Sequence, residues 1–443
     1  MKHPLLMTMA LAAALSIPTE AAARVWDLNQ CLAYAQEHNI RVQKNRLTEQ
    51  TAQEDLKQKR AALWPSVSAS INQGVNYHPF PESYTDASGL TYNVSKKAIY
   101  SGSYGINANW TLWNGGVNQN NIKAQEIQNQ LYQLATEQSQ LALQEQIAQF
   151  YVQIMYCQEA TKVNETLLTT ARKQYDRGVE MKRYGQIAKA DLAQLEAQVA
   201  ACEYNVVNSQ TQVANFKRQL KALLELDMNE DFDLQGQNPA DESVMQPIPA
   251  MQDVYAYAQA NRPEMRTAEL SQKAAEINEE IARGGMMPTI SLGANVGDSH
   301  NTNGHGAQMK TNLNLSAGLT VSIPLWQQRR NITNVNKAKM QRIDAQLDLE
   351  DTRNTLSSTI EQYWLDATNG QHNFQAAQTR VESQQASYEL LNEQFSNGLK
   401  NIVELLESRD QLVSAKQDML QAKYTTLLNI QLLKLYGGDT INL

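Results

Sequence analysis

An internal duplication constrains the fold of this chain more than any other feature. The tetrapeptide Ala-Tyr-Ala-Gln occurs at 33–36 and again at 256–259, an offset of 223 residues. Further along, the dipeptide Leu-Trp recurs at 112–113 and 325–326, and this offset of 213 residues then holds over more than one hundred positions. The change of ten residues falls between two strand-like segments, so the first copy has the longer hairpin loop. The chain is therefore expected to build one unit twice, rather than the two or three unrelated domains that its length suggests.

Each copy ends in segments that can be helical over unusual lengths. No proline occurs between Pro81 and Pro239, and none follows Pro324, so these stretches lack the residue that most disrupts helix interiors. Apolar residues in the first stretch recur at heptad spacing, which is typical of coiled-coil packing. The expected long helices span about 117–184, 187–225, 330–397 and 400–436.

Two alternating segments precede each pair of long helices. In one of them, Tyr104, Ile106 and Ala108 alternate with Gly105 and Asn107, the pattern of a strand with one apolar face. Strands of about ten residues can cross a bilayer when they are tilted. The four expected strands span about 66–77, 101–113, 289–297 and 311–325.

Four strands cannot close a membrane barrel by themselves. Open strand edges are not viable in lipid, and the smallest closed membrane barrels have about eight strands. Several copies of the chain would therefore share one barrel, and the strand count alone permits two, three or more. A soluble sandwich also shows alternation, but the export signal described next and the aromatic residues near the strand ends favour a membrane barrel.

The N-terminus has the layout of a secretory signal peptide at residues 1–23. Lys2 and His3 precede an uncharged apolar run at 5–15, and a short stretch of alanines ends at Ala23. This run is too short to be a transmembrane helix, so it indicates export and cleavage. The remaining chain is expected to consist of a first repeat at 24–226, a proline-containing connector at 227–251 and a second repeat at 252–443.

Composition and motifs disfavour several function classes. The formal net charge is −8 and the charges are scattered, whereas nucleic-acid-binding proteins usually show a basic patch. Three scattered cysteines are too few for a disulfide framework. His300 and His305 lie in a polar loop whose spacing fixes no metal geometry, so an ordinary loop is the favoured interpretation. The sequence shows no nucleophile–base pair and no phosphate-binding loop, so neither an enzyme nor a cofactor is expected.

With these features together, the chain resembles the TolC-like outer-membrane factor family. The similarity extends over about residues 26–438 and includes strand entries at Pro65 and Pro288 and helix turns at Gly185 and Gly398. It implies a mainly α-helical fold with a transmembrane β-barrel, in which a homotrimer forms a twelve-stranded barrel above a periplasmic α-helical tunnel. It also implies location in the outer membrane, and two partners: a periplasmic adaptor protein and an inner-membrane transporter of the RND type.

The function that the resemblance implies is a passive exit duct for small molecules such as drugs and toxic compounds. An exit duct of a type I protein secretion system remains open, because it would use the same architecture with another inner-membrane partner. A structural coiled-coil protein of the cell surface is the third alternative. The duplicated order of strands and helices disfavours it, since a stalk needs no strands in each repeat.

The resemblance also assigns an acidic periplasmic entrance to Glu404 and Glu407. In the family, two acidic positions three residues apart form rings around the entrance, and residues with this spacing lie on one helix face. Rings of carboxylates attract cations and repel anions. Without the resemblance, a solvated acidic helix face would be the favoured interpretation of this pair.

The same comparison implies a closed constriction at the helix tips. Lys400 matches a cation that ties the tip to the neighbouring hairpin, and Asp191 matches its acidic partner. Phe395 replaces a family tyrosine, so one hydroxyl hydrogen bond cannot form, and packing around Phe395 and Leu399 is expected instead. The residues expected at the adaptor-docking tips are Gly185, Gln186, Gly398 and Leu399.

Two tryptophans occupy equivalent positions just after a strand in each copy. Trp113 and Trp326 are expected to anchor the chain at a membrane interface, where tryptophan is enriched. Simple packing between the barrel and the helices is the alternative interpretation.

Overall fold

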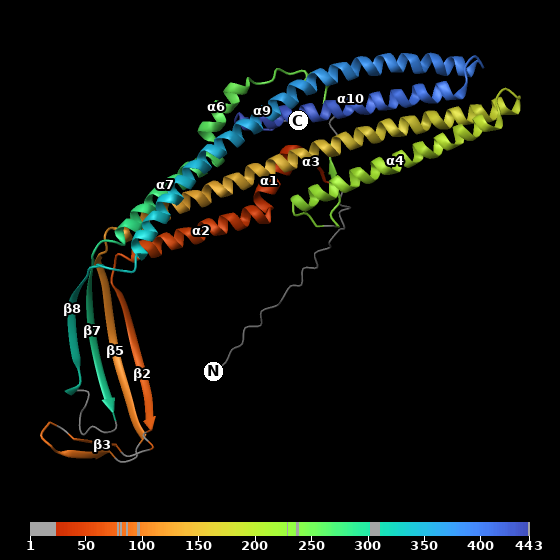
Figure 1. Cartoon of the computed structure of the whole chain (residues 1–443). Coiled ribbons are helices and arrows are strands. Elements are labelled where there is room, and N and C mark those ends of the chain that lie inside the picture. Colours follow the sequence, from red (N-terminus) through yellow and green to blue (C-terminus); the bar gives the residue numbers. More distant parts are fainter. Residues whose placement is uncertain are drawn as a thin grey trace, which may run out of the picture.

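The computed structural model describes residues 24–77, 79, 82–85, 87–94, 98–227, 229–235, 239–301 and 311–441. The expected signal peptide, residues 1–23, lies outside this part of the chain. Figure 1 shows a narrow sheet at one end of the molecule and long helices that run away from it at an angle. The mainly helical structure with a four-stranded sheet agrees with the predicted fold class, a mainly α-helical protein with a transmembrane β-barrel.

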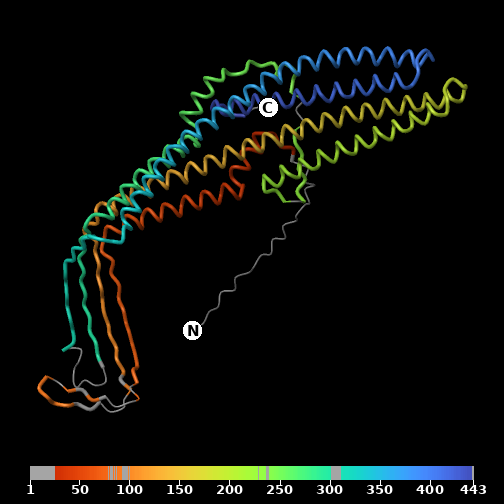
Figure 2. The backbone as a smooth tube through the Cα atoms, in the orientation of Figure 1, coloured from red at the N-terminus to blue at the C-terminus, as the bar shows by residue number. Residues whose placement is uncertain are grey.

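Two helical hairpins of equal size dominate the molecule. Each consists of a helix of 67 residues followed by an antiparallel helix of 35 residues. At 1.5 Å per residue, the longer helix is about 100 Å long. The tips of both hairpins point to the same end of the molecule, and the second helix of one hairpin packs against the first helix of the other (Figures 1 and 2). The helices are α3 (Val117–Arg183), α4 (Lys189–Leu223), α9 (Arg330–Ser396) and α10 (Ile402–Tyr436).

Shorter helices extend both hairpins toward the sheet. Each copy has a helix of 11 residues followed by one of 22 residues. The longer helix of the second copy packs between α3 and α9, whereas that of the first copy packs on α3 alone. These helices are α1 (Leu28–His38), α2 (Ile40–Ala61), α6 (Met251–Asn261) and α7 (Pro263–Gly284).

The four main strands form one antiparallel sheet in the order β2–β5–β7–β8. The central pair, β5 and β7, joins the two copies of the repeat, with Ala108 opposite Ala294. β2 and β7 run from the helix junction to the far end of the sheet, and β5 and β8 run back. At the far end, β3 (Glu82–Thr85) and β4 (Thr91–Val94) form a small hairpin. The strands are β2 (Ser66–Tyr77), β5 (Ala98–Trp113), β7 (Thr289–Asn301) and β8 (Asn314–Ser322).

The largest apolar core lies halfway along the molecule, where the short helices meet the long ones. Ile147, Ile154 and Leu220 are fully buried there. The parallel pair β1 (Arg24–Trp26) and β6 (Phe232–Leu234) covers this region together with the connector between the copies. The short helix α5 (Asp241–Val244) of that connector packs its Val244 against the second hairpin.

No helix within the described ranges is both long enough and apolar enough to cross a membrane.

Candidate channel surfaces and tip contacts

The sheet separates apolar from polar side chains completely in its central rows. Residues directly opposite each other in antiparallel strands lie on the same face. One row on the first face consists of Ala69, Ile106, Val296 and Leu315. The adjacent row on the other face consists of Ser68, Asn107, Asn295 and Ser316, and here the Asn295 side-chain amide donates to the Asn107 side-chain carbonyl. The apolar face could contact lipid, and the uncharged polar face could contact water.

Among the residues that the structure describes, none covers either face of the sheet or pairs with the outer edge of β2 or β8. Every residue of β2 and every residue of β8 is exposed. The exposed side chains include Ile71 on β2 and Leu319 on β8, both on the apolar face. Unpaired edges and bare apolar surface of this size are avoided in water-soluble monomers. The sheet therefore requires an apolar environment on one face and further strands at both edges.

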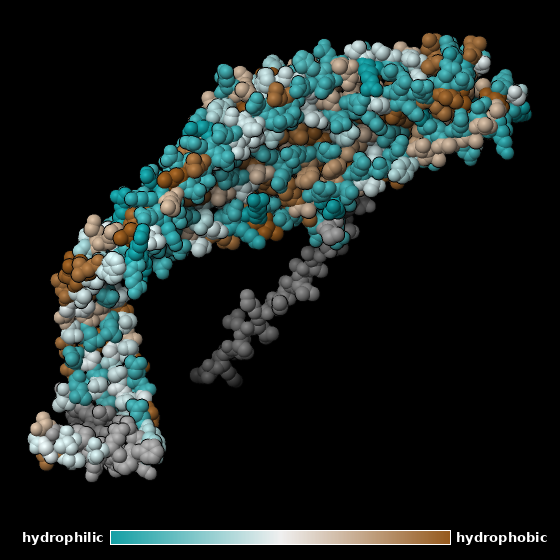
Figure 3. Space-filling model, in the orientation of Figure 1, coloured by the Kyte–Doolittle hydropathy of each residue, from teal (hydrophilic) through white to brown (hydrophobic). Residues whose placement is uncertain are grey.

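Hydrophobic residues gather where the sheet meets the helices (Figure 3), and three tryptophans lie in the same zone. Trp113 closes β5 and is partly exposed, whereas Trp326 follows β8 and is 80% exposed. A third tryptophan, Trp64, lies in the equivalent zone just before β2 and is also largely exposed. The sequence-based prediction missed Trp64, although its place beside the strand-entry proline Pro65 could have indicated it.

Equivalent glycines turn the chain at both hairpin tips. Gly185 and Gly398 each have a φ of +73°, the left-handed conformation that ends helices at low cost when the residue is glycine. The next residue in each turn donates its backbone N–H back into the helix, from Gln186 to Met181 and from Leu399 to Gln394, both at 2.9 Å. Leu399 is 73% exposed in the single chain, and its packing at a closed tip remains a prediction.

The two carboxylates predicted to line the entrance lie on the first turns of α10. Glu404 is half exposed, and its carboxylate accepts a hydrogen bond from Lys400 Nζ at 2.6 Å. Asn401 Oδ1 caps the helix by accepting from the Glu404 backbone N–H at 3.0 Å. Glu407 lies one turn further and is exposed. Because Lys400 compensates Glu404, Glu407 provides the less compensated negative charge on this face.

Within a single chain, Lys400 and Asp191 have other partners. Lys400, in the turn just before α10, pairs with Glu404 in the first turn of that helix, while Asp191 accepts from the Ala188 backbone N–H at 3.0 Å. A carboxylate at this position satisfies a free N–H group at the start of α4, a common arrangement at helix N-termini. A contact of Lys400 with Asp191 of another copy remains a prediction.

Other residues connect the two hairpins near their tips. Gln174 Nε2 on α3 donates to Tyr388 Oη at 2.8 Å and to Asn392 Oδ1 at 2.9 Å on α9. Arg177 Nη2 donates to the Ser396 carbonyl at 3.1 Å. These contacts were missed by the sequence-based prediction, because nothing in the sequence pairs residues that are 214 to 219 positions apart.

Phe395 belongs to the apolar layer beneath these hydrogen bonds. It is 4% exposed and lies in one cluster with Met181 and Leu195 of the first hairpin and with Ile402 of its own. Gly178 allows this approach, since a Cβ atom there would lie 2.5 Å from Leu195 Cδ1. Gly178 therefore serves close helix packing inside α3, and the chain turns at Gly185 instead.

The helix ends halfway along the molecule are joined differently in the two copies. Asn39 Nδ2 donates to the Leu223 carbonyl at 3.0 Å in the first copy. Arg262 takes the equivalent position in the second copy and is 6% exposed; its guanidinium carbon lies 3.7 Å from the centre of the Tyr436 ring. Leu223 and Tyr436 are also equivalent positions. The first copy therefore joins these helix ends by a hydrogen bond from a side-chain amide, and the second copy joins them by a cation–π contact.

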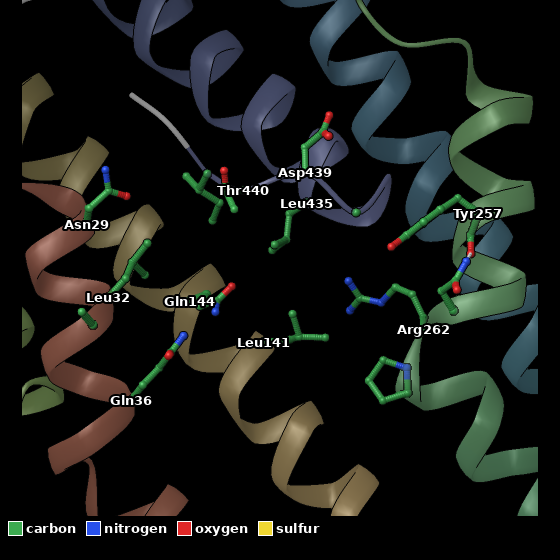
Figure 4. A pocket seen from close by; sticks show the side chains of 15 residues that line it. Asn29, Leu32, Gln36, Leu141, Gln144, Tyr257, Arg262, Leu435, Asp439 and Thr440 are labelled. Carbon is green, nitrogen blue, oxygen red and sulfur yellow. Dashed lines mark hydrogen bonds between the residues drawn. The ribbon is translucent and has the colours of Figure 1, made fainter.

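Arg262 also connects the second copy to the first. Its side chain makes two hydrogen bonds with Glu264, at 3.0 and 2.9 Å, and lies 3.5 Å from Glu145 on α3. Burial raises the pKa of the Glu145 carboxyl, an effect that the Arg262 charge only partly offsets. Figure 4 shows Arg262 beside a cavity of about 470 Å³ that Leu141, Leu435 and Tyr257 also line.

The histidine loop and the cysteines provide no assembled metal site in the described residues. The His300 ring lies 5.7 Å from the Tyr104 ring and 5.8 Å from the Tyr100 ring, measured between centroids. His305 lies outside the described residues. Across the described ranges, no group of three or more potential ligand side chains is arranged to hold a metal.

Comparisons with known proteins agree with this architecture. The family model for outer membrane efflux proteins matches residues 32–225 and 254–438, one segment in each copy. The outer membrane protein TolC of Escherichia coli (strain K12) is 23% identical over 412 residues, covering 91% of this chain and 80% of the relative. The toluene efflux pump outer membrane protein TtgC of Pseudomonas putida is 24% identical over 388 residues, covering 86% and 76%.

Solved structures show the same fold. The outer membrane protein VceC of Vibrio cholerae superposes with a TM-score of 0.76 at 15% identity, covering 94% of this chain and 97% of the other. The Campylobacter jejuni CmeC outer membrane channel has a TM-score of 0.76 at 17% identity, covering 94% and 86%. The predicted family, fold class and location in the outer membrane are thereby confirmed. The chain belongs to the outer membrane efflux protein family, whose fold is that of channel proteins and not of enzymes.

Proposed function

We propose that three copies of this chain form one duct through the outer membrane and the periplasm, which serves as the passive exit of a tripartite efflux system. The observation that carries this proposal is the bare four-stranded sheet attached to two helical hairpins about 100 Å long. An apolar sheet face of this size is unfavourable in water, and the helical hairpins of the same chain do not cover it.

Closure among copies explains both unpaired edges. If β8 of one copy pairs with β2 of the next, every edge is satisfied, as lipid demands. Three copies give twelve strands, which is within the range of closed membrane barrels. The row through Val296 and Leu315 then faces lipid, and the row through Asn295 and Ser316 faces a water-filled interior.

The tips are the proposed periplasmic entrance. Threefold symmetry would bring Glu404 and Glu407 of each copy toward one axis, where carboxylates would favour cations over anions. The paired Lys400 reduces this effect at Glu404, so Glu407 contributes more of the selectivity. The exposed Leu399 and the Gly185 and Gly398 turns are the proposed docking points for a periplasmic adaptor.

The substrate class is proposed to be small molecules that an inner-membrane pump of the RND type and its adaptor hand over. Support comes from relatives in Pseudomonas putida, which include the outer membrane protein of a toluene efflux pump and that of an antibiotic efflux pump. The small, uncharged side chains on the polar face of the sheet fit a duct that does not bind its cargo tightly.

Single-channel recording in planar bilayers tests the duct and its entrance together. We expect a small cation-selective conductance for the purified protein, and loss of that selectivity in the variant Glu404→Ala/Glu407→Ala. The matched control is Glu276→Ala/Glu280→Ala, which removes the same charge from the exposed surface of α7. Unchanged selectivity in the first variant would refute the entrance assignment. Absence of any channel from folded, assembled protein would refute the duct.

A further inference from the structure

The turn at residues 326–330, between β8 and α9, is strained in a way that its counterpart is not. Gln328 and Arg329 have φ values of +50° and +64°, which residues with a side chain rarely adopt. The equivalent residues of the first copy are Gly115 and Gly116, with φ values of +68° and +79°. Glycine adopts this conformation without steric cost. The second copy thus forms the same turn from residues for which this backbone conformation is unfavourable. Strain of this kind is often found where side chains have a function.

Positive charge gathers at this turn without acidic residues nearby in the sequence. Between Asp298 and Asp344 the chain contains no aspartate and no glutamate. Arg329 and Arg330 are exposed, and Arg330 Nη2 donates to the uncharged Gln327 side chain at 2.8 Å. The further cations of this stretch near the turn are Lys337, Lys339 and Arg342, of which Arg342 is paired with Glu279 at 3.0 Å. The first copy has a single cation, Lys123, over the equivalent helix start.

The turn lies at the margin of the apolar sheet face. Leu325 and Trp326, which directly precede it, are 90% and 80% exposed. Asn331 Nδ2 donates to the Gly285 carbonyl at 2.8 Å, which holds the turn beside the end of α7 and close to the sheet. An exposed tryptophan next to arginines, at the edge of an apolar surface, is the arrangement found where a protein passes through the headgroup region of a bilayer.

We propose that Arg329 and Arg330 bind the phosphate groups of anionic phospholipids at the periplasmic surface of the membrane, with Trp326 inserted beside them. This inference rests on the proposed membrane position of the sheet. The guanidinium group suits a phosphate partner, since its planar N–H groups can bind two phosphate oxygens at once. Lys337 lies about 10 Å further along α9, near the limit at which charges still attract each other in physiological salt.

The first copy supplies the natural test variant, Arg329→Gly/Arg330→Val, because Gly116 and Val117 are the equivalent residues. Detergent-solubilised protein is titrated with phosphatidylglycerol, and the thermal midpoint of unfolding is followed. We expect stabilisation of the wild type at a lipid concentration about 25-fold below that needed by the variant. This ratio assumes about 1 kcal/mol for each arginine near an anionic surface and 1.4 kcal/mol for each factor of ten.

Two controls separate lipid binding from general effects. The variant Arg266→Ala/Lys273→Ala removes the same charge from exposed positions of α7 that are further from the sheet, and its response should equal that of the wild type. Titration with phosphatidylcholine should stabilise all variants alike. If inorganic phosphate reproduces the effect of phosphatidylglycerol, the site binds a free anion and the lipid proposal is wrong.

The backbone strain predicts a second effect, in which the variant is at least as stable as the wild type when no anionic lipid is present. Without anionic lipid, Arg329→Gly/Arg330→Val should unfold at the same temperature as the wild type or higher, because glycine relieves the strained turn. Should this variant fail to fold, Arg329→Gln/Arg330→Gln keeps a polar side chain at both positions and removes the charge. Equal responses of wild type and charge-free variant to phosphatidylglycerol would overturn the proposal. Failure of the wild type to form channels would instead refute the proposed function.

Discussion

At the scale of single residues, the two copies differ where the structure needs a specific contact. Asn39 and Arg262 occupy equivalent positions, yet only Arg262 reaches into the other copy, where it lies 3.5 Å from Glu145. The equivalent of Glu145 in the second copy is Ser358, so the reverse contact has no carboxylate. The duplication therefore supplies the shared frame, and individual substitutions supply the asymmetric connections between the halves.

Removing the charge of Glu145 should change how the stability depends on pH. Burial raises the pKa of this carboxyl in the folded chain, so the stability linked to its protonated form is present at low pH and is lost as the pH rises through the raised pKa. We expect Glu145→Gln to unfold at an equal or higher temperature than the wild type at neutral pH, with a smaller decrease between pH 5 and pH 7.5. Thermal unfolding at several pH values measures this difference.

The matched comparison is Glu264→Gln, because Glu264 makes the two short hydrogen bonds with the buried Arg262. Glu264 is partly exposed and Arg262 keeps Glu145 nearby, so the loss should be smaller than the roughly 3–5 kcal/mol that removal of one partner of a fully buried pair costs. This variant should still be less stable than the wild type at every pH tested. A loss of similar size in Glu145→Gln would show that Glu145 is the main partner of Arg262.

At the scale of elements, close packing between helices depends on a few small residues. Gly370 on α9 faces Thr426 on α10, and a Cβ atom at Gly370 would lie 3.1 Å from Thr426 Cβ and closer still to its hydroxyl. Thr426 is fully buried, and its hydroxyl donates to the Ala422 carbonyl at 2.6 Å. The two helices of the second hairpin can approach this closely only while position 370 lacks a side chain.

Gly370→Ala should therefore destabilise the second hairpin. Overpacking of a tight core costs about 1–3 kcal/mol, which exceeds the gain of about 1 kcal/mol from replacing glycine in a helix. Gly318→Ala, in the open space of the sheet, is the comparison, since no atom lies within 4 Å of a Cβ there. A lower unfolding temperature for Gly370→Ala than for Gly318→Ala is the expected result, and the reverse order would contradict it.

The contacts between the hairpins make a second prediction at this scale. Gln174→Ala/Arg177→Ala removes the hydrogen bonds to Tyr388, Asn392 and Ser396, so the tips should separate more easily and the resting conductance should rise. Lys400→Ala serves as the comparison, because within one chain Lys400 contacts Glu404 of the same hairpin. An increase in Lys400→Ala alone would instead favour a contact of Lys400 with another copy.

At the scale of the whole molecule, the two faces of one sheet must lie in different environments. Leu319 and Thr320 are neighbours in β8 and point to opposite faces. Arginine on a lipid-facing position near the bilayer midplane costs about 2–4 kcal/mol, whereas arginine in a water-filled interior is solvated. The same substitution at these two adjacent positions therefore reports which face contacts lipid.

Leu319→Arg should reduce the amount of protein assembled in the outer membrane, while Thr320→Arg should assemble and shift the channel selectivity toward anions. Membrane fractionation followed by single-channel recording distinguishes the two variants. Equal assembly of both would show that the assignment of the two faces is wrong.

The sequence by itself determined the local elements and their order. Proline-free stretches, period-two alternation and the repeat are local properties of the chain, and each follows from backbone sterics and the period of the side chains. The left-handed turns at Gly185 and Gly398 belong here too, because the residue type decides which backbone conformation is accessible. The resemblance to a known family then supplied the trimer and the entrance residues, which neither spacing nor composition could provide.

The tertiary structure alone decided which distant residues meet. The pairing of β5 with β7, the hydrogen bonds of Gln174 with Tyr388, and the contact of Arg262 with Glu145 join residues more than one hundred positions apart. Lys400 shows most clearly what the sequence could not decide, because its charge suits Asp191 as well as Glu404. In the single chain, the turn before α10 brings its Nζ to 2.6 Å from the Glu404 carboxylate. Charge and polarity in a sequence state what a side chain can bind, whereas packing of the helices determines what lies within its reach.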